Sequence, residues 1–191
     1  MANNDAPFGL RPVRTGISAQ QQNRYRIANN YGTAIFQGDL VKVVTGGGIE
    51  RVTASPGTDL ILGVFNGCFY TDPTTGKPTY SAYYPGSVAA DDIMATIIDD
   101  PGATFEVQSD EAFPVADLMG NFKIVATAGD TTSGMSRVEL DTSTGATTAT
   151  LPLKAIDISQ DPENSDVGSA NTNVIVKINN HLFSGGTAGL A

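Results

Sequence analysis

Short runs of β-branched and aromatic residues, separated by turn-forming residues, recur along most of this 191-residue chain. Turn signals at roughly every 8–12 residues are typical of β-barrels and β-sandwiches. Sustained helical periodicity is almost absent, and the best helix candidate is the brief stretch 113–120. We therefore predict a mainly β fold with a small β-barrel or β-tulip-like body, and a jelly roll as the alternative. The expected strands span residues 40–44, 49–53, 60–65, 68–70, 79–84, 93–98, 104–108, 122–126, 137–140, 153–158 and 173–178.

The chain divides by composition into three parts. Residues 1–34 contain several Pro and Gly residues and a polar run at 18–23, with too little apolar material to bury alone. We expect them to form an extended N-terminal arm whose removal, through residue 30, leaves the rest folded. Residues 35–183 form the expected β-rich body, and the Gly-rich residues 184–191 a flexible C-terminal tail.

Charge is distributed unevenly along the chain, whose net charge is −9. The arm carries four arginines and one acid, whereas the remainder is strongly acidic. An acidic body repels phosphate, so we expect no nucleic-acid partner. The arm instead suits an acidic protein surface, on a shell or on a sister subunit, although its arginines could simply keep a terminus soluble. Its expected contact residues are Phe8, Arg11, Arg14, Arg24 and Arg26.

The overall proportion of charged residues is low, at 16%. Globular proteins average roughly 25%. Here Thr, Ser, Asn and Gly replace the missing charges, giving a surface that loses little when another protein covers it. This composition favours an assembly subunit over a free metabolic enzyme.

No arrangement of residues matches a common catalytic or metal-binding motif. The lone Cys68 lies in an apolar run, and the lone His181 is expected at the surface. Residues 46–48 lack the third glycine of a dinucleotide-binding loop and join two strands. Residues 161–166 could gather oxygens around Ca²⁺, but they lack the EF-hand spacing, and an ordinary acidic loop is favoured. We expect no catalytic residue, no cofactor and no metal.

Two pairs of neighbouring aspartates, 91–92 and 99–100, are the best candidates for acid–base hydrolysis. A strand between them would separate the pairs by about 20 Å. Glycoside hydrolysis requires carboxyl groups roughly 5–10 Å apart. Solvated turns explain these pairs better than a shared active site, and an unusual hydrolase remains only a minor alternative.

No apolar stretch approaches the roughly 20 residues that span a membrane. The first residues lack the basic and apolar regions of a secretory signal. We therefore expect no membrane partner and assembly in a cytoplasm.

Several segments resemble structural proteins of tailed-phage virions. The opening Ala6-Pro7-Phe8-Gly9-Leu10-Arg11-Pro12 is similar to the start of many such proteins. Gln37-Gly38-Asp39-Leu40-Val41-Lys42, Gly48-Ile49-Glu50-Arg51-Val52 and Asp59-Leu60-Ile61-Leu62-Gly63-Val64-Phe65 resemble the pattern of lambda-like capsid decoration, or cement, proteins. Ile98-Asp99-Asp100-Pro101 through Phe105-Glu106-Val107-Gln108 is similar to a segment of larger relatives.

The resemblance implies a β-barrel or β-tulip body on the outer surface of an icosahedral head. Its partner would be the major capsid protein, with an extended terminus lying across neighbouring capsid subunits. Such proteins are often trimeric, so we expect a homotrimer, with a dimer as the alternative. Another virion component, such as a head-fibre base or a carbohydrate-binding spike, is the alternative function. Tyr80, Tyr83 and Tyr84 would then form the sugar-binding platform, although strand packing explains them more readily.

Overall fold

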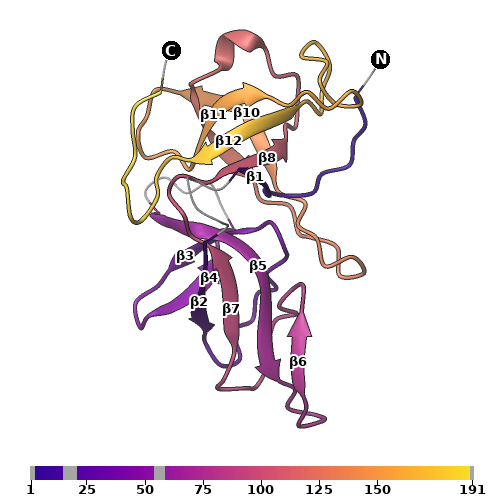
Figure 1. The fold of residues 1–191 in the computed structure, drawn as a ribbon, viewed down its shortest axis with the longest axis vertical. Coiled ribbons are helices and arrows are strands. Elements are labelled where there is room, and N and C mark those ends of the chain that lie inside the picture. Colours follow the sequence, from indigo (N-terminus) through magenta and orange to yellow (C-terminus); the bar gives the residue numbers. More distant parts are fainter. Residues whose placement is uncertain (1–2, 15–20, 54–58, 190–191) are drawn as a thin grey trace.

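The computed structural model describes residues 3–14, 21–53 and 59–189, which are organised as two six-stranded β-sheets. One sheet lies above the other along the long axis of the molecule (Figure 1). The upper sheet has the order β1-β8-β12-β11-β9-β10. Its strands are β1 (Arg11–Arg14), β8 (Thr104–Gln108), β9 (Asn121–Val125), β10 (Glu139–Ala146), β11 (Leu153–Ile158) and β12 (Asn173–Ile178).

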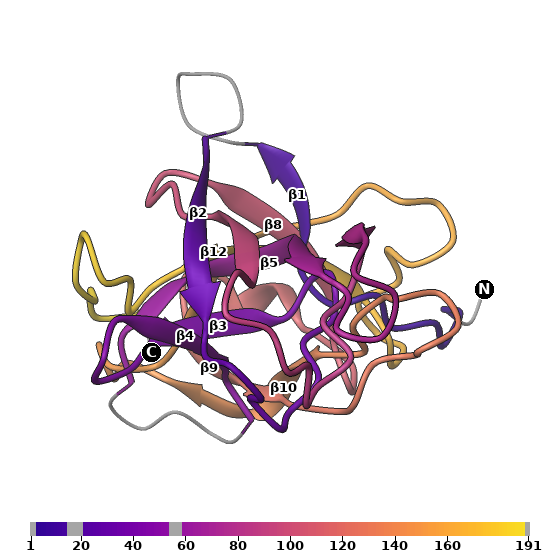
Figure 2. The ribbon, with the colours of Figure 1, turned by 90° about the horizontal axis from the view of Figure 1, so that it is seen from below.

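The lower sheet has the order β3-β4-β2-β7-β5-β6, and β3 also pairs with β5. This extra pairing closes β3, β4, β2, β7 and β5 into a five-stranded barrel, which Figure 2 shows from below. Strand β6 extends the sheet beyond the barrel, beside β5 (Figure 1). The strands are β2 (Gln22–Ile27), β3 (Leu40–Val43), β4 (Gly48–Arg51), β5 (Ile61–Thr71), β6 (Pro78–Ser81) and β7 (Met94–Ile98). The prediction of a mainly β fold with a small barrel is confirmed.

The upper sheet curls so that its edge strand β10 approaches β8. An isolated bridge joins Ser109 to Leu140, and the Asp110 amide donates a hydrogen bond of 3.1 Å to the Leu140 carbonyl. A large apolar core fills this curl and extends into the junction between the two sheets. A second core, which includes Phe65 and Tyr84, fills the lower barrel.

The expected strands of the body are present to within a few residues, with two exceptions: the strands expected at 60–65 and 68–70 are the single strand β5, and β10 extends to Ala146. The helix expected over 113–120 is reduced to a single 3₁₀ turn, η1 (Val115–Asp117), in which no residue is buried. Because the residues of this turn have no apolar face to bury, packing adds too little to stabilise a longer helix. Within the described residues, no helix has the length and apolar character needed to cross a membrane.

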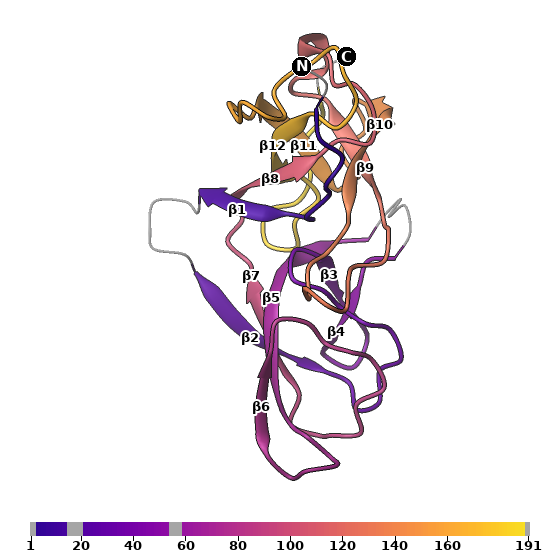
Figure 3. The same cartoon turned by 90° about the vertical axis from the view of Figure 1, so that its right-hand side faces the viewer.

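Residues 1–34 differ most from expectation, because their described part belongs to the body. Strand β1 pairs with β8 in the upper sheet, and β2 lies between β4 and β7 in the lower barrel. Figure 3 shows β1 and β2 one above the other on the same side of the molecule. Leu10 and Ile27 each enter one of the two cores. The segment contains few apolar residues, but Leu10 and Ile27 are buried, and sheet pairing satisfies much of its backbone.

Gly9 lets the N-terminal segment pass between two loops of the body. Its φ is +71°, and an added Cβ would lie 2.5 Å from Ser136 Cβ and 2.9 Å from the Gly38 oxygen. The next amide, of Leu10, donates to the Gly38 carbonyl at 2.9 Å. A side chain at position 9 has neither the conformation nor the space it needs.

The expected C-terminal tail is held against the upper sheet as far as it is described. The Asn121 amide donates to the Thr187 carbonyl at 2.8 Å, and the Lys154 ammonium to the Ala188 carbonyl at 2.8 Å. Residues 190–191 lie outside the described residues.

Candidate interaction surface

The outer face of the lower barrel carries an exposed row of apolar, aromatic and cationic side chains. Strand register aligns Arg26 with Met94, Met94 with Phe69, and Phe69 with Tyr80, across β2, β7, β5 and β6. Directly paired residues point to the same face of a sheet, so these side chains form one continuous row. Arg24 and its partner Thr96 lie on the same face, one step along the strands.

We refer to Arg24, Arg26, Phe69, Tyr80, Met94 and Thr96 as the outer barrel face. Arg24 and Arg26 are exposed, Met94 and Phe69 are half-buried, and Tyr80 is 74% exposed. The Phe69 and Tyr80 rings pack with their centroids 4.9 Å apart. Arg, Met, Phe and Tyr are the residue types enriched at protein–protein interfaces.

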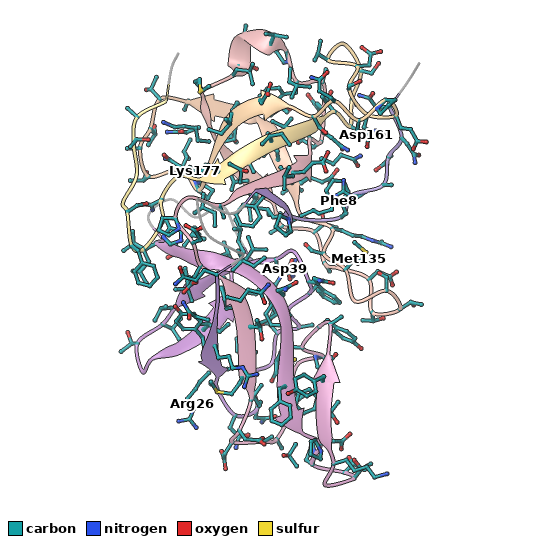
Figure 4. The ribbon with its side chains drawn as sticks, viewed as in Figure 1. Phe8, Arg26, Asp39, Met135, Asp161 and Lys177 are labelled. Atoms are coloured by element: carbon teal, nitrogen blue, oxygen red, sulfur yellow. The ribbon has the colours of Figure 1, made fainter. Side chains whose placement is uncertain are left out.

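The predicted contact residues of the arm do not lie on a single surface. Arg24 and Arg26 lie on the outer barrel face, and Arg26 also donates to the Asp91 carbonyl at 2.9 Å. Phe8 lies apart from them, near the junction of the two sheets (Figure 4). Arg11 forms an ion pair with Glu106 and lies over the Phe8 ring, 4.6 Å from its centroid. Arg14 ends β1 opposite Thr104, and its side chain is outside the described part of the chain.

Phe8 and Met135 lie close together at the junction and line a groove of about 650 Å³. Asp5, Asp130, Glu139 and Arg137 contribute to the same groove. Burial raises the pKa of Glu139, and the nearby charges of Asp5 and Asp110 raise it further. The groove is therefore net acidic, whereas the outer barrel face carries two arginines.

A buried ion pair connects the lower barrel to the loop that precedes β10. Asp39 is fully buried, and its Oδ2 lies 2.8 Å from Arg51 Nε. Ser136 Oγ donates to Asp39 Oδ1 at 2.6 Å, and Arg51 donates to the Thr127 carbonyl at 2.6 Å. Burial raises the pKa of Asp39, while the charge of Arg51 opposes that rise. This pair has no access to a substrate and contributes to the sheet junction.

The two aspartate pairs lie at opposite ends of β7 and make separate contacts. Asp92 accepts hydrogen bonds from the Thr71 amide and hydroxyl, which lower the pKa of its carboxyl group. Asp99 accepts from the Asn23 amide at 2.8 Å and the Tyr25 hydroxyl at 2.5 Å. Burial and this last hydrogen bond raise the pKa of Tyr25 to about 12. The two aspartate pairs therefore do not form a common site.

Other residues considered for chemistry are engaged in the structure. His181 is fully buried, so its expected surface position is wrong, and its Nδ1 accepts a hydrogen bond of 3.1 Å from the Phe183 amide. Asp161 accepts from the Glu163 amide, and Asp166 from the Gly168 amide, as turn-stabilising carboxylates do. Within residues 3–14, 21–53 and 59–189, no three His, Cys, Asp or Glu side chains are grouped to hold a metal ion.

Cys68 is buried in the lower core, and burial raises the pKa of its thiol to about 12. The thiolate is the species that attacks iodoacetamide, and it is scarce at pH 8 for such a group. We expect Cys68 in the folded protein to resist iodoacetamide at pH 8 and to be labelled fully in urea. Mass spectrometry of the labelled protein measures both; rapid labelling without denaturant would contradict the buried placement.

The three tyrosines considered as a sugar-binding platform are not presented together. Tyr84 is fully buried and donates to the Tyr31 carbonyl at 2.8 Å. Tyr83 is half-buried and stacks on Phe36, with ring centroids 5.4 Å apart. Tyr80 alone of the three is exposed.

Sequence reasoning named Arg24, Arg26 and Tyr80, but it missed Phe69 and Met94. The signal for Met94 is its place in the run Met94–Ile98, where Ala95 and Ile97 are the alternate buried residues. An apolar residue at an outward position of a strand can indicate a contact surface. The strand register that joins it to Phe69 is set by the barrel and is not readable from either strand alone.

Comparisons with protein-family models, with curated proteins and with solved structures find no match for this chain.

Proposed function

We propose that this protein is a virion structural protein that decorates the outer surface of a tailed-phage head and stabilises contacts between major capsid subunits. The observation that carries the proposal is the outer barrel face, an exposed sheet surface composed of residue types enriched at interfaces. The resemblance of the sequence to cement proteins gives the class of partner. In this proposal the protein performs no catalysis.

The arginines of β2 give this face its polarity. Arg24 and Arg26 are exposed on a chain whose net charge is −9, so they form a local basic patch on an acidic protein. Such a basic patch favours binding to an acidic patch on the shell. Arg11 is already paired with Glu106 and so contributes less charge to a partner. The proposal therefore assigns the contact with the capsid to the outer barrel face, and not to a free N-terminal arm.

Decoration also suits the energetics of a shell. A protein that binds only the assembled head stabilises that state by mass action. If one copy, or one oligomer, spans two capsid subunits, its second contact gains from a high effective concentration. Moderate contacts by a small exposed face can then hold the protein on the head.

Cosedimentation with heads assembled without this protein tests the proposal. We expect the wild type to sediment with the heads, and Arg24→Glu and Arg26→Glu to weaken binding by about tenfold, more at low salt. Arg137→Glu is the matched control, because it makes the same charge change at an exposed position in the acidic groove. Failure of the wild type to sediment with heads would refute the function, whereas equal binding by all variants would refute the assigned face.

A further inference from the structure

Strand β6 presents an unpaired backbone edge on the lower sheet. It pairs only with β5, in four consecutive register positions without a bulge, and no described segment pairs with its outer side. Figure 1 shows it at the free margin of the sheet. Its residues, Pro78–Ser81, carry no charge, and Tyr80 projects from it into solvent.

The free edge of the upper sheet is built differently. Strand β1 contains Pro12 within the strand, carries Arg11 and Arg14, and shifts register between Pro12 and Arg14. Proline, charged residues and bulges are the features with which proteins block pairing at sheet edges. The β6 edge has its proline only at the first position, where it leaves the following amides able to pair. One edge is protected and the other is open to a further strand.

We propose that β6 pairs antiparallel with β6 of a second copy, about a two-fold axis, and joins the two lower sheets into one. The pairing brings the two Tyr80 ends of the outer barrel face together at the centre. In each copy β7 and β5 separate β2 from β6, so the two Arg26 side chains lie far from the axis, at opposite ends of the joined face. The joined sheet presents one continuous face with an apolar centre, and the contact between the two copies is made by the main-chain groups of the two β6 strands.

Charge complementarity supports a second copy as the occupant. Lys77 immediately precedes β6, whereas Ala82 and Tyr83 follow it and lie beside the loop tip at Gly134, where an added Cβ would be 3.2 Å from Ala82 Cβ. Asp130 belongs to that tip, because its carbonyl accepts the Gly134 amide at 2.8 Å. Antiparallel pairing places the hairpin tip of each copy, which carries Lys77, beside the end of the other copy's strand, on the side of the Asp130 loop. Asp72 lies on the same tip, but its carboxylate already accepts hydrogen bonds from the Thr74 and Thr75 amides of its own turn. The hairpin tips that carry the two Lys77 residues lie at opposite ends, so these like charges do not meet.

This dimer is independent of the proposed capsid function and is tested on the protein alone. Sedimentation velocity of the full chain should give twice the chain mass of 19.8 kDa. Tyr80→Lys should weaken the dimer by about tenfold or more, because it sets two like charges beside the axis. Lys77→Glu should weaken it in a salt-dependent manner. Val115→Lys, at a 58% exposed position on η1, is the control and should leave the mass unchanged.

Tyr80 is exposed, so Tyr80→Lys should keep the wild-type circular dichroism spectrum and a cooperative unfolding transition, and these measurements separate lost pairing from lost folding. A monomer at about 100 µM, where even a weak specific dimer forms, would overturn the proposal. A trimer would also overturn it, because a two-fold pairing closes at two copies. A dimer that Tyr80→Lys and Lys77→Glu leave intact would place the contact elsewhere.

Discussion

Deleting residues 1–30 is expected to leave the remaining chain unfolded. The deletion removes β2, which joins β4 to β7 and so closes the lower barrel, and it removes β1 from the upper sheet. It also takes Leu10 and Ile27 out of the two cores, where they are 1% and 3% exposed. Opening a barrel exposes two unpaired strand edges and its interior, and the loss exceeds the roughly 5–15 kcal/mol by which a domain is stable.

Circular dichroism and amide NMR dispersion measure this outcome. The control is complementation, in which a peptide of residues 1–30 is added to the truncated chain and should restore the native spectrum. A truncated chain that unfolds cooperatively by itself would contradict the place of β2 in the barrel. It would instead support the independent arm that the composition of residues 1–34 suggests.

Replacing Arg51 with Met is expected to destabilise the protein by about 3–5 kcal/mol, because Asp39 is then left buried without its cationic partner. The loop at Thr127 loses its hydrogen bond to the guanidinium in the same variant. Urea denaturation at pH 7 measures the change. A loss below about 1 kcal/mol, the range of exposed ion pairs, would contradict the burial of this pair.

Two further comparisons separate the charge from the packing of this pair. Asp39→Asn combined with Arg51→Met should be less destabilising than Arg51→Met alone, because no charge remains buried. Lowering the pH should also reduce the difference in free energy of unfolding between Arg51→Met and the wild type. Burial already raises the pKa of Asp39, and loss of Arg51 removes a contact that lowers it. The folded variant therefore takes up a proton more readily than the unfolded chain, and its relative stability improves as the pH falls from 7 toward the ordinary aspartate pKa.

The strands of the body could be predicted because each has its own local signal. In β5, the apolar run begins at Ile61, and Asp72 to Lys77 form the expected turn before β6. Strand β2 has no such signal, because within Gln22–Ile27 only Ile27 is buried. Its strand state comes from β4 and β7, whose unpaired edges it covers, and this is a tertiary effect.

The same distinction explains what could be known of the interaction surface. The basic character of Arg24 and Arg26 is visible in the sequence, but the assignment to an arm hides their neighbours. Met94 and Phe69 are remote in sequence from both, and only the pairing of β2 with β7, β7 with β5 and β5 with β6 brings the four strands into one face. Conversely, the sequence placed Phe8 and Arg11 with the β2 arginines, whereas the fold separates them because β1 and β2 enter different sheets.

The most direct test of the account is a cryo-electron microscopy map of heads mixed with the protein. We predict density at every symmetry-equivalent site of one class on the shell, with Arg24, Arg26 and Met94 facing the major capsid protein. Heads without ordered density at any symmetry-related site, or copies whose outer barrel face points to solvent, would contradict it.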